Sequence, residues 1–159
     1  MEKFRLKVID HVCVVVRDLQ KTMEQYWNMV GIGPWSIYTM VPSDTTLRDK
    51  SKHFSMKMAF TRVGSMKLEL IQPLEGESVY EDFLDKRGEG VHHIASYTVD
   101  DLDRAVGLLG KHGIHVLQRG TWGGATFVYL DTEKTLGTVI ELTKRTVCFP
   151  NPENVYPRT

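Results

Sequence analysis

One order of residues occurs twice in this chain of 159 residues, and such a repeat limits the possible folds more than any single motif does. Residues 11–19 (HVCVVVRDL) parallel residues 93–102 (HIASYTVDDL), with one residue inserted in the second copy. Each copy is later followed by an acidic residue between apolar neighbours, Glu69 in the first and Glu141 in the second. The repeat therefore predicts two related halves of one domain.

Patterns of polarity predict the same elements in each half. The β-branched run at 7–16 is typical of a strand, and Asp18 and Gly31 are favourable residues for the start and end of the helix that follows. The polar, aperiodic residues 42–52 predict a mobile loop. The other elements that we expect are strands at 35–41, 54–63 and 66–71, a helix from the capping box at 78–81 to Arg87, a strand at 91–99, a helix from Asp100 or Asp101 to Gly113, and strands at 114–118, 125–130 and 138–143.

Each half thus has the order strand, helix, strand, strand, strand. The fold class that we predict is α+β, with residues 1–159 as a single domain. Its first module spans about 7–75 and its second about 90–145. If the modules pack about a pseudo-twofold axis, equivalent positions that face inward meet at that axis.

The composition excludes several classes of partner. Twenty basic residues balance twenty acidic ones, so nothing favours nucleic acid. No apolar run is long enough to cross a membrane, and the charged first residues are unlike a secretory signal. The two cysteines form no disulfide scaffold and are expected to be reduced thiols. We expect a soluble cytoplasmic protein that forms a homodimer.

Four residues of the repeat carry the predicted chemistry. A single histidine in a strand is more often structural than a ligand, and a single glutamate such as Glu69 or Glu141 can point to water while its apolar neighbours point inward. The repeat weakens these explanations, because it brings His11, Glu69, His93 and Glu141 to the same axis. Two imidazoles and two carboxylates would there hold one divalent cation, with Ni, Co, Zn, Mn and Fe all suitable. The repeat selects His93 over His92, which we place on the surface or behind the ligands.

These features resemble the vicinal oxygen chelate superfamily (glyoxalase, bleomycin resistance and dioxygenase proteins). The most specific pieces are residues 9–12 (IDHV), 67–74 (KLELIQPL), 90–95 (GVHHIA) and 139–142 (VIEL). The resemblance implies two βαβββ modules that form a half-open mixed barrel around a metal. It also implies that His11, Glu69, His93 and Glu141 are the metal ligands.

Within that superfamily, residues 72–93 look most like the methylmalonyl-CoA epimerases. One departure stands out. Some epimerases carry a second catalytic glutamate on the strand before the first ligand glutamate, whereas residues 54–60 (FSMKMAF) contain no acid and have Lys57 instead. A cation at Lys57 could bind a carboxylate or phosphate of the substrate.

A cation with two open positions favours removal of a proton next to a carbonyl. We therefore predict a metal-dependent isomerase of the epimerase type that acts on an acyl-CoA or an oxo compound. Glu141 is the first candidate base, and Glu69 or a group within 42–57 is the second. A glyoxalase I-like lyase acting on a hemithioacetal is the main alternative. An extradiol dioxygenase, which uses one carboxylate ligand, and a metal-free small-molecule binding protein fit the four residues less well.

Overall fold

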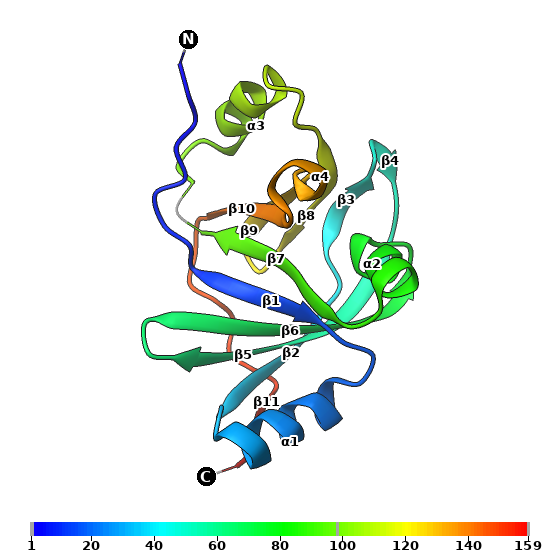
Figure 1. The fold of residues 1–159 in the computed structure, drawn as a ribbon, viewed down its shortest axis with the longest axis vertical. Helices are drawn as coiled ribbons and strands as arrows, with labels where there is room; N and C mark the ends of the chain where they lie inside the picture. Colours follow the sequence, from blue (N-terminus) through cyan, green and yellow to red (C-terminus); the bar gives the residue numbers. More distant parts are fainter. Residues whose placement is uncertain (1, 98, 159) are drawn as a thin grey trace.

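The computed structural model describes residues 2–97 and 99–158, and this part of the chain forms one curled sheet with four helices (Figure 1). The elements are, in chain order, β1 (His11–Val15), α1 (Leu19–Val30), β2 (Trp35–Met40), β3 (Ser43–Leu47), β4 (Lys50–Ser51), β5 (Phe54–Val63), β6 (Met66–Gly76), α2 (Val79–Arg87), β7 (Gly90–Ser96), α3 (Leu102–Gly110), β8 (Val116–Trp122), β9 (Ala125–Leu130), α4 (Glu133–Leu136), β10 (Val139–Arg145) and β11 (Asn154–Tyr156). The predicted α+β class is confirmed.

The order of the strands in the sheet is symmetric about its centre. It runs β11-β2-β5-β6-β1-β7-β10-β9-β8-β3-β4, and the antiparallel pair β1–β7 joins the two halves. On each side of this pair the next strand is parallel, β6 beside β1 and β10 beside β7. Each parallel strand then pairs antiparallel with the strand before it in the chain, β5 or β9. The strands that follow the two copies of the repeated segment therefore occupy equivalent places.

The pairing register places the repeated residues at equivalent points. His11 is paired with Lys67, two residues before Glu69, and His93 is paired with Val139, two residues before Glu141. Because alternate residues of a strand share a face, each histidine lies on the same face of the sheet as the glutamate of its own half. The curl of the sheet then turns this face inward.

Helices α1 and α3 cover the outer face of the sheet (Figure 1). Helix α1 begins as predicted, with the Asp18 carboxylate accepting a hydrogen bond from the backbone N–H of Lys21, and its cap residue Gly31 has a φ of 68°. This helix covers β5 and β6, and α3 covers β10, each over an apolar cluster of its own. A third cluster fills the inside of the curled sheet. Helix α2 contributes Val79, Tyr80 and Leu84 to this inner cluster, and the side chains of the strands supply the rest of it.

The predicted mobile loop at 42–52 is wrong. These residues form β3 and β4, and β3 pairs with β8 from the other half of the chain. Thr45 and Leu47 are buried, and the hydroxyl of Thr45 donates to the backbone carbonyl of Lys52. A polar strand is stable here because its backbone groups pair and its two inward side chains are small or apolar.

Several boundaries also differ from the predictions. The predicted strand at 91–99 ends at Ser96, and Thr98 lies outside the described residues. The strand predicted at 114–118 is shifted to 116–122, while α4 and β11 were not predicted. No helix in the described part of the chain is long and apolar enough to cross a membrane. The predicted homodimer and the cytoplasmic location stay predictions.

Candidate metal centre

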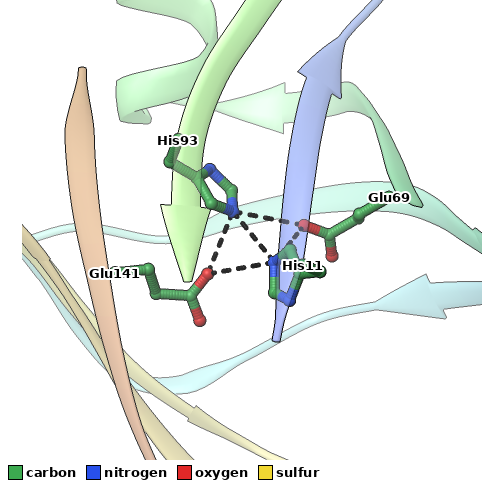
Figure 2. A group of neighbouring side chains, drawn as sticks. All are labelled: His11, Glu69, His93 and Glu141. Carbon is green, nitrogen blue, oxygen red and sulfur yellow. Dashed lines mark hydrogen bonds and ion pairs between the residues drawn. The ribbon is translucent and has the colours of Figure 1, made fainter. Parts of the chain in front are cut away.

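The four side chains singled out by the repeat lie together at the centre of the sheet (Figure 2). They come from four strands, β1, β6, β7 and β10, and their potential ligand atoms all lie within 4.8 Å of one another. Glu69 Oε2 is 3.1 Å from His11 Nε2 and 3.2 Å from His93 Nε2. Glu141 Oε2 is 3.6 Å and 3.0 Å from the same two nitrogens, which are 3.2 Å apart. One atom of each side chain thus points to a common centre.

Burial makes this arrangement costly unless a cation compensates it. The two histidines are fully buried, and Glu69 and Glu141 are only 4% and 5% exposed, so neither carboxylate points to bulk water. Apart from these two imidazole nitrogens, Glu69 Oε2 has no hydrogen-bond partner among the described residues. Removing two carboxylates from water is unfavourable without compensating charge. Two imidazole nitrogens and two carboxylate oxygens that face one another are a suitable donor set for a divalent cation of intermediate softness.

The pKa values of the cluster depend on both burial and the neighbouring charges. Burial by itself raises the pKa of Glu69 and lowers that of His93. The opposite charges outweigh burial: His11 and His93 bring the pKa of Glu69 well below its ordinary value, and Glu141 and Glu69 raise the pKa of His93 to about 9. Without a bound cation, the proton that His93 keeps therefore balances part of the negative charge of the two carboxylates. Burial, followed by the charge of Glu69, also raises the pKa of the Cys13 thiol, so Cys13 is a neutral neighbour.

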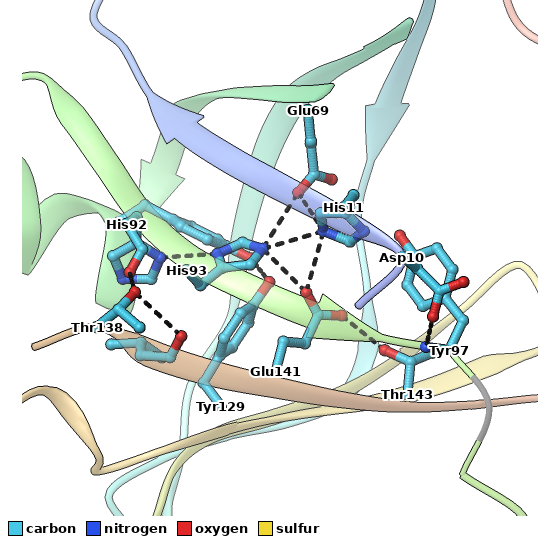
Figure 3. A network of polar contacts seen from close by, with 12 residues as sticks. Asp10, His11, Glu69, His92, His93, Tyr97, Tyr129, Thr138, Glu141 and Thr143 are labelled. Carbon is cyan, nitrogen blue, oxygen red and sulfur yellow. Dashed lines mark hydrogen bonds and ion pairs between the residues drawn. The ribbon is translucent and has the colours of Figure 1, made fainter. Parts of the chain in front are cut away.

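Two residues outside the cluster orient its members (Figure 3). The Nδ1 atoms of His92 and His93 are 2.9 Å apart, on the side of His93 away from the centre. Burial keeps the pKa of His92 well below its ordinary value, so its neutral ring can accept the Nδ1–H of His93 and leave Nε2 of His93 free as a ligand atom. On the other side, the hydroxyl of Thr143 donates to Glu141 Oε1 at 2.6 Å, while Oε2 faces the histidines.

His92 is therefore not a surface residue. It is 4% exposed because aromatic side chains of α2 and β9 surround its ring, with Phe83 at 5.1 Å and Tyr80 at 5.6 Å between centroids. It lies behind His93, as one of the two predicted positions requires, and the alternative of a surface position is wrong. The other histidines have no counterpart in the repeat, are exposed and do not belong to the cluster: His53, His112 and His115.

A small cavity of about 40 Å³ adjoins the cluster on the inside of the sheet. Glu69 and Glu141 line it, so the ligand atoms can be reached from this side. Most of its wall is apolar, contributed by Met40, Met56, Met58, Phe60, Trp122, Phe127 and Phe149. Besides the two glutamates, four polar residues line the cavity: Tyr97, Tyr129, Thr143 and Arg145. The cavity thus provides a small, mostly apolar space beside the carboxylates of Glu69 and Glu141.

The cation predicted at Lys57 does not reach this cavity. Lys57 is exposed, whereas its neighbours Met56 and Met58 line the cavity, as strand alternation requires. The cation of the cavity is Arg145, which the sequence analysis did not identify. A signal was present, because Glu141, Thr143 and Arg145 alternate along β10 and so share one face.

Comparison with known proteins is consistent with this geometry. The family model described as the Glyoxalase/Bleomycin resistance protein/Dioxygenase superfamily matches residues 10–129, and the chain belongs to that family. It is 28% identical over 137 residues to the uncharacterized protein YqjC of Bacillus subtilis, covering 84% of this chain and 89% of YqjC. It is 29% identical over 138 residues to the mitochondrial methylmalonyl-CoA epimerase of Homo sapiens, covering 84% of this chain and 72% of the human protein.

A solved structure of a variant of Streptomyces coelicolor methylmalonyl-CoA epimerase, in complex with 2-nitronate-propionyl-CoA, superimposes with a TM-score of 0.60. Its sequence is 26% identical, and the match covers 90% of this chain and all of the other. The relatives and structural neighbours of this chain thus include epimerases of acyl-CoA substrates. The predicted resemblance to the superfamily and to its epimerase branch is confirmed.

Proposed function

We propose that this protein is a divalent-metal-dependent isomerase that removes and returns a proton α to the carbonyl of an acyl-CoA thioester, as methylmalonyl-CoA epimerases do. The observation that carries the proposal is the convergence of two buried histidines and two buried glutamates beside a cavity. The relatives and structural neighbours named as methylmalonyl-CoA epimerases support the substrate class. The proposed ligands are His11, Glu69, His93 and Glu141.

Each group of the site has a proposed task. A divalent cation held by the four residues would polarise the carbonyl oxygen of the substrate and stabilise the negative charge that develops on it. Glu141 lines the cavity and accepts the α-proton, a role worth about 10²–10⁴-fold in rate. Thr143 holds one oxygen of this carboxylate, so the other keeps a fixed direction. The aromatic and methionine wall excludes water from the reacting carbon.

Epimerisation needs a second group that returns a proton to the opposite face of the carbon. Glu69 is the proposed second group, because it lines the same cavity from the other half of the sheet. Segment 42–57 offers no acid there, since the one residue of it that lines the cavity is Met56. In this proposal, Glu69 and Glu141 therefore exchange protons on opposite faces of the α-carbon.

A glyoxalase I-like lyase stays the second candidate. The apolar inner side of β5 supplies no acid, and a proton shift between adjacent carbons on one face needs only one base. Glu141 alone would then suffice. The two candidates differ in the substrate and in the number of bases, not in the proposed metal ligands.

Deuterium exchange separates them. The protein, loaded in turn with Co, Ni, Zn, Mn or Fe, is incubated in D₂O with methylmalonyl-CoA and with ethylmalonyl-CoA. We expect incorporation at the α-carbon that is lost on chelation and in Glu141→Gln, and kept in Glu75→Gln, a change of an exposed glutamate on β6. Turnover of a hemithioacetal without exchange in any thioester would favour the lyase, and failure of both reactions would refute the proposed enzyme.

We also infer that residues 1–159 make a single domain of two modules, at about 7–75 and 90–145. The support is the symmetric strand order and the continuous sheet. Strand β3 supports it further, because it lies within the first module but pairs with β8 of the second.

A further inference from the structure

We propose that Arg145 binds the acidic group of the substrate and is therefore a residue that determines the specificity of this site. This inference rests on the proposed function, since it assigns a residue that recognises the substrate of the same site. Arg145 is the last residue of β10 and lines the cavity with Glu69 and Glu141.

The guanidinium of Arg145 has unused hydrogen-bonding capacity. Its Nη1 is buried and has no hydrogen-bond partner among the described residues. A buried N–H without an acceptor is unfavourable in a folded protein and calls for an explanation. Burial also lowers the pKa of Arg145 from its ordinary value, although arginine stays charged in proteins. A ligand that supplies an acceptor oxygen would satisfy this atom.

The plane of the guanidinium is held by aromatic rings. Its Cζ lies 4.2 Å from the ring centroid of Phe149 and 5.5 Å from that of Tyr97. Phe149 is itself fixed by edge contacts with Tyr38, Phe60 and Trp122, at centroid distances of 5.1 to 5.7 Å. Stacking fixes the plane and leaves the N–H groups at its edge for an acceptor, which is how arginine recognises carboxylates in a forked geometry.

The charge of the site favours the same ligand. A divalent cation among the four donors would be neutralised by Glu69 and Glu141, which leaves Arg145 as uncompensated positive charge in the cavity. Lys67, whose Nζ lies 5.3 Å from the centroid of the Tyr97 ring, adds a second cation nearby, and the carboxylate of Asp10 offsets part of its charge. The cavity is small, about 40 Å³, and Glu69 and Glu141 line it too, so an anion bound by Arg145 would lie close to the residues that would hold the cation.

A merely structural role for Arg145 makes a different prediction. As a stacking partner of Phe149, it would fix the segment after β10 over the cavity and would have no preference among ligands. The test must therefore compare charged and neutral ligands of one shape. Malonate and malonamide are such a pair, and neither undergoes the proposed reaction.

The experiment measures the binding of both compounds to nickel-loaded protein by calorimetry. We expect Arg145→Met to weaken malonate binding by about 10- to 100-fold and to leave malonamide binding and nickel content unchanged. Arg145→Lys keeps the charge but loses the forked pair of N–H donors. Its affinity for malonate should therefore lie between those of the wild type and Arg145→Met. Lys144→Met removes the same charge from the exposed neighbouring position and should bind as the wild type does.

Three results would overturn the assignment: no binding of malonate to the wild type, equal binding to wild type and Arg145→Met, or an equal loss for malonamide. If Arg145→Met does not fold, as judged by circular dichroism, the comparison of wild type with Arg145→Lys decides by the same criteria. The proposed function fails separately. If malonate binding depends on Arg145 but no thioester exchanges its α-proton, the isomerase is refuted and the anion site stands.

Discussion

Replacing His92 by leucine should weaken metal binding although His92 is not a proposed ligand. The change removes the acceptor 2.9 Å from His93 Nδ1 in a position that is 4% exposed. The Nδ1–H of His93 is then buried without a partner, which costs about 1–3 kcal/mol. Since 1.4 kcal/mol is tenfold in an equilibrium constant, the loss of affinity is at most about 150-fold, because the metal-free protein bears part of the same cost. This agrees with the roughly 10–100-fold usually found for residues that orient a metal-bound histidine.

His92→Asn is the matched control. The side-chain oxygen of asparagine lies near the place of the histidine Nδ1 and can accept the same hydrogen bond, so this variant should bind metal nearly as tightly as the wild type. Both changes leave a smaller side chain beside Phe83 and Tyr80, so both should lower the melting temperature. The assay is competition for zinc or nickel against a chelator of known affinity. Equal affinities in His92→Leu and the wild type, or an equal loss in the two variants, would refute this role.

Three further outcomes are expected. Glu69→Gln should lower metal affinity by more than about 100-fold in the chelator assay, because a neutral amide replaces a charged ligand, whereas Glu75→Gln should not change it. The pKa of His93, raised to about 9 without a cation, means that metal must displace a proton below that pH. Apparent affinity should therefore rise about tenfold per unit from pH 6.5 to 9 and then level off, and a flat profile would contradict the proton count. Thr143→Val removes the hydrogen bond to Glu141 and should slow α-proton exchange by about tenfold, measured by deuterium incorporation; an unchanged rate would mean that Thr143 does not position the base.

The repeat made most of the site predictable. A histidine and a glutamate in equivalent places of two copies need only a twofold arrangement to meet, and strand alternation then puts each pair on one face. Helix α1 was equally predictable from the sequence, because its cap residues Asp18 and Gly31 act locally. These features depend on the residues themselves or on their own half of the chain.

Other features depend on contacts between distant segments. Strand β3 is stable because it pairs with β8, about seventy residues later in the chain, and its own residues show little strand character. His92 is buried because Tyr80 and Phe83 of α2 cover it. Arg145 lies on the cavity side of β10 by simple alternation, but its importance follows from a buried nitrogen that only the structure reveals.

The placement of the four proposed ligands on four strands would link metal binding to folding of the whole chain. His11 and Glu141 stand 130 positions apart, so no local segment can present the full set and the unfolded chain has little affinity for the ion. Any cation bound there selects the native state by mass action, and free metal at 100 times the dissociation constant would stabilise it by about 2.7 kcal/mol. The supply of metal in the surroundings would then influence how long each molecule survives, quite apart from its effect on turnover.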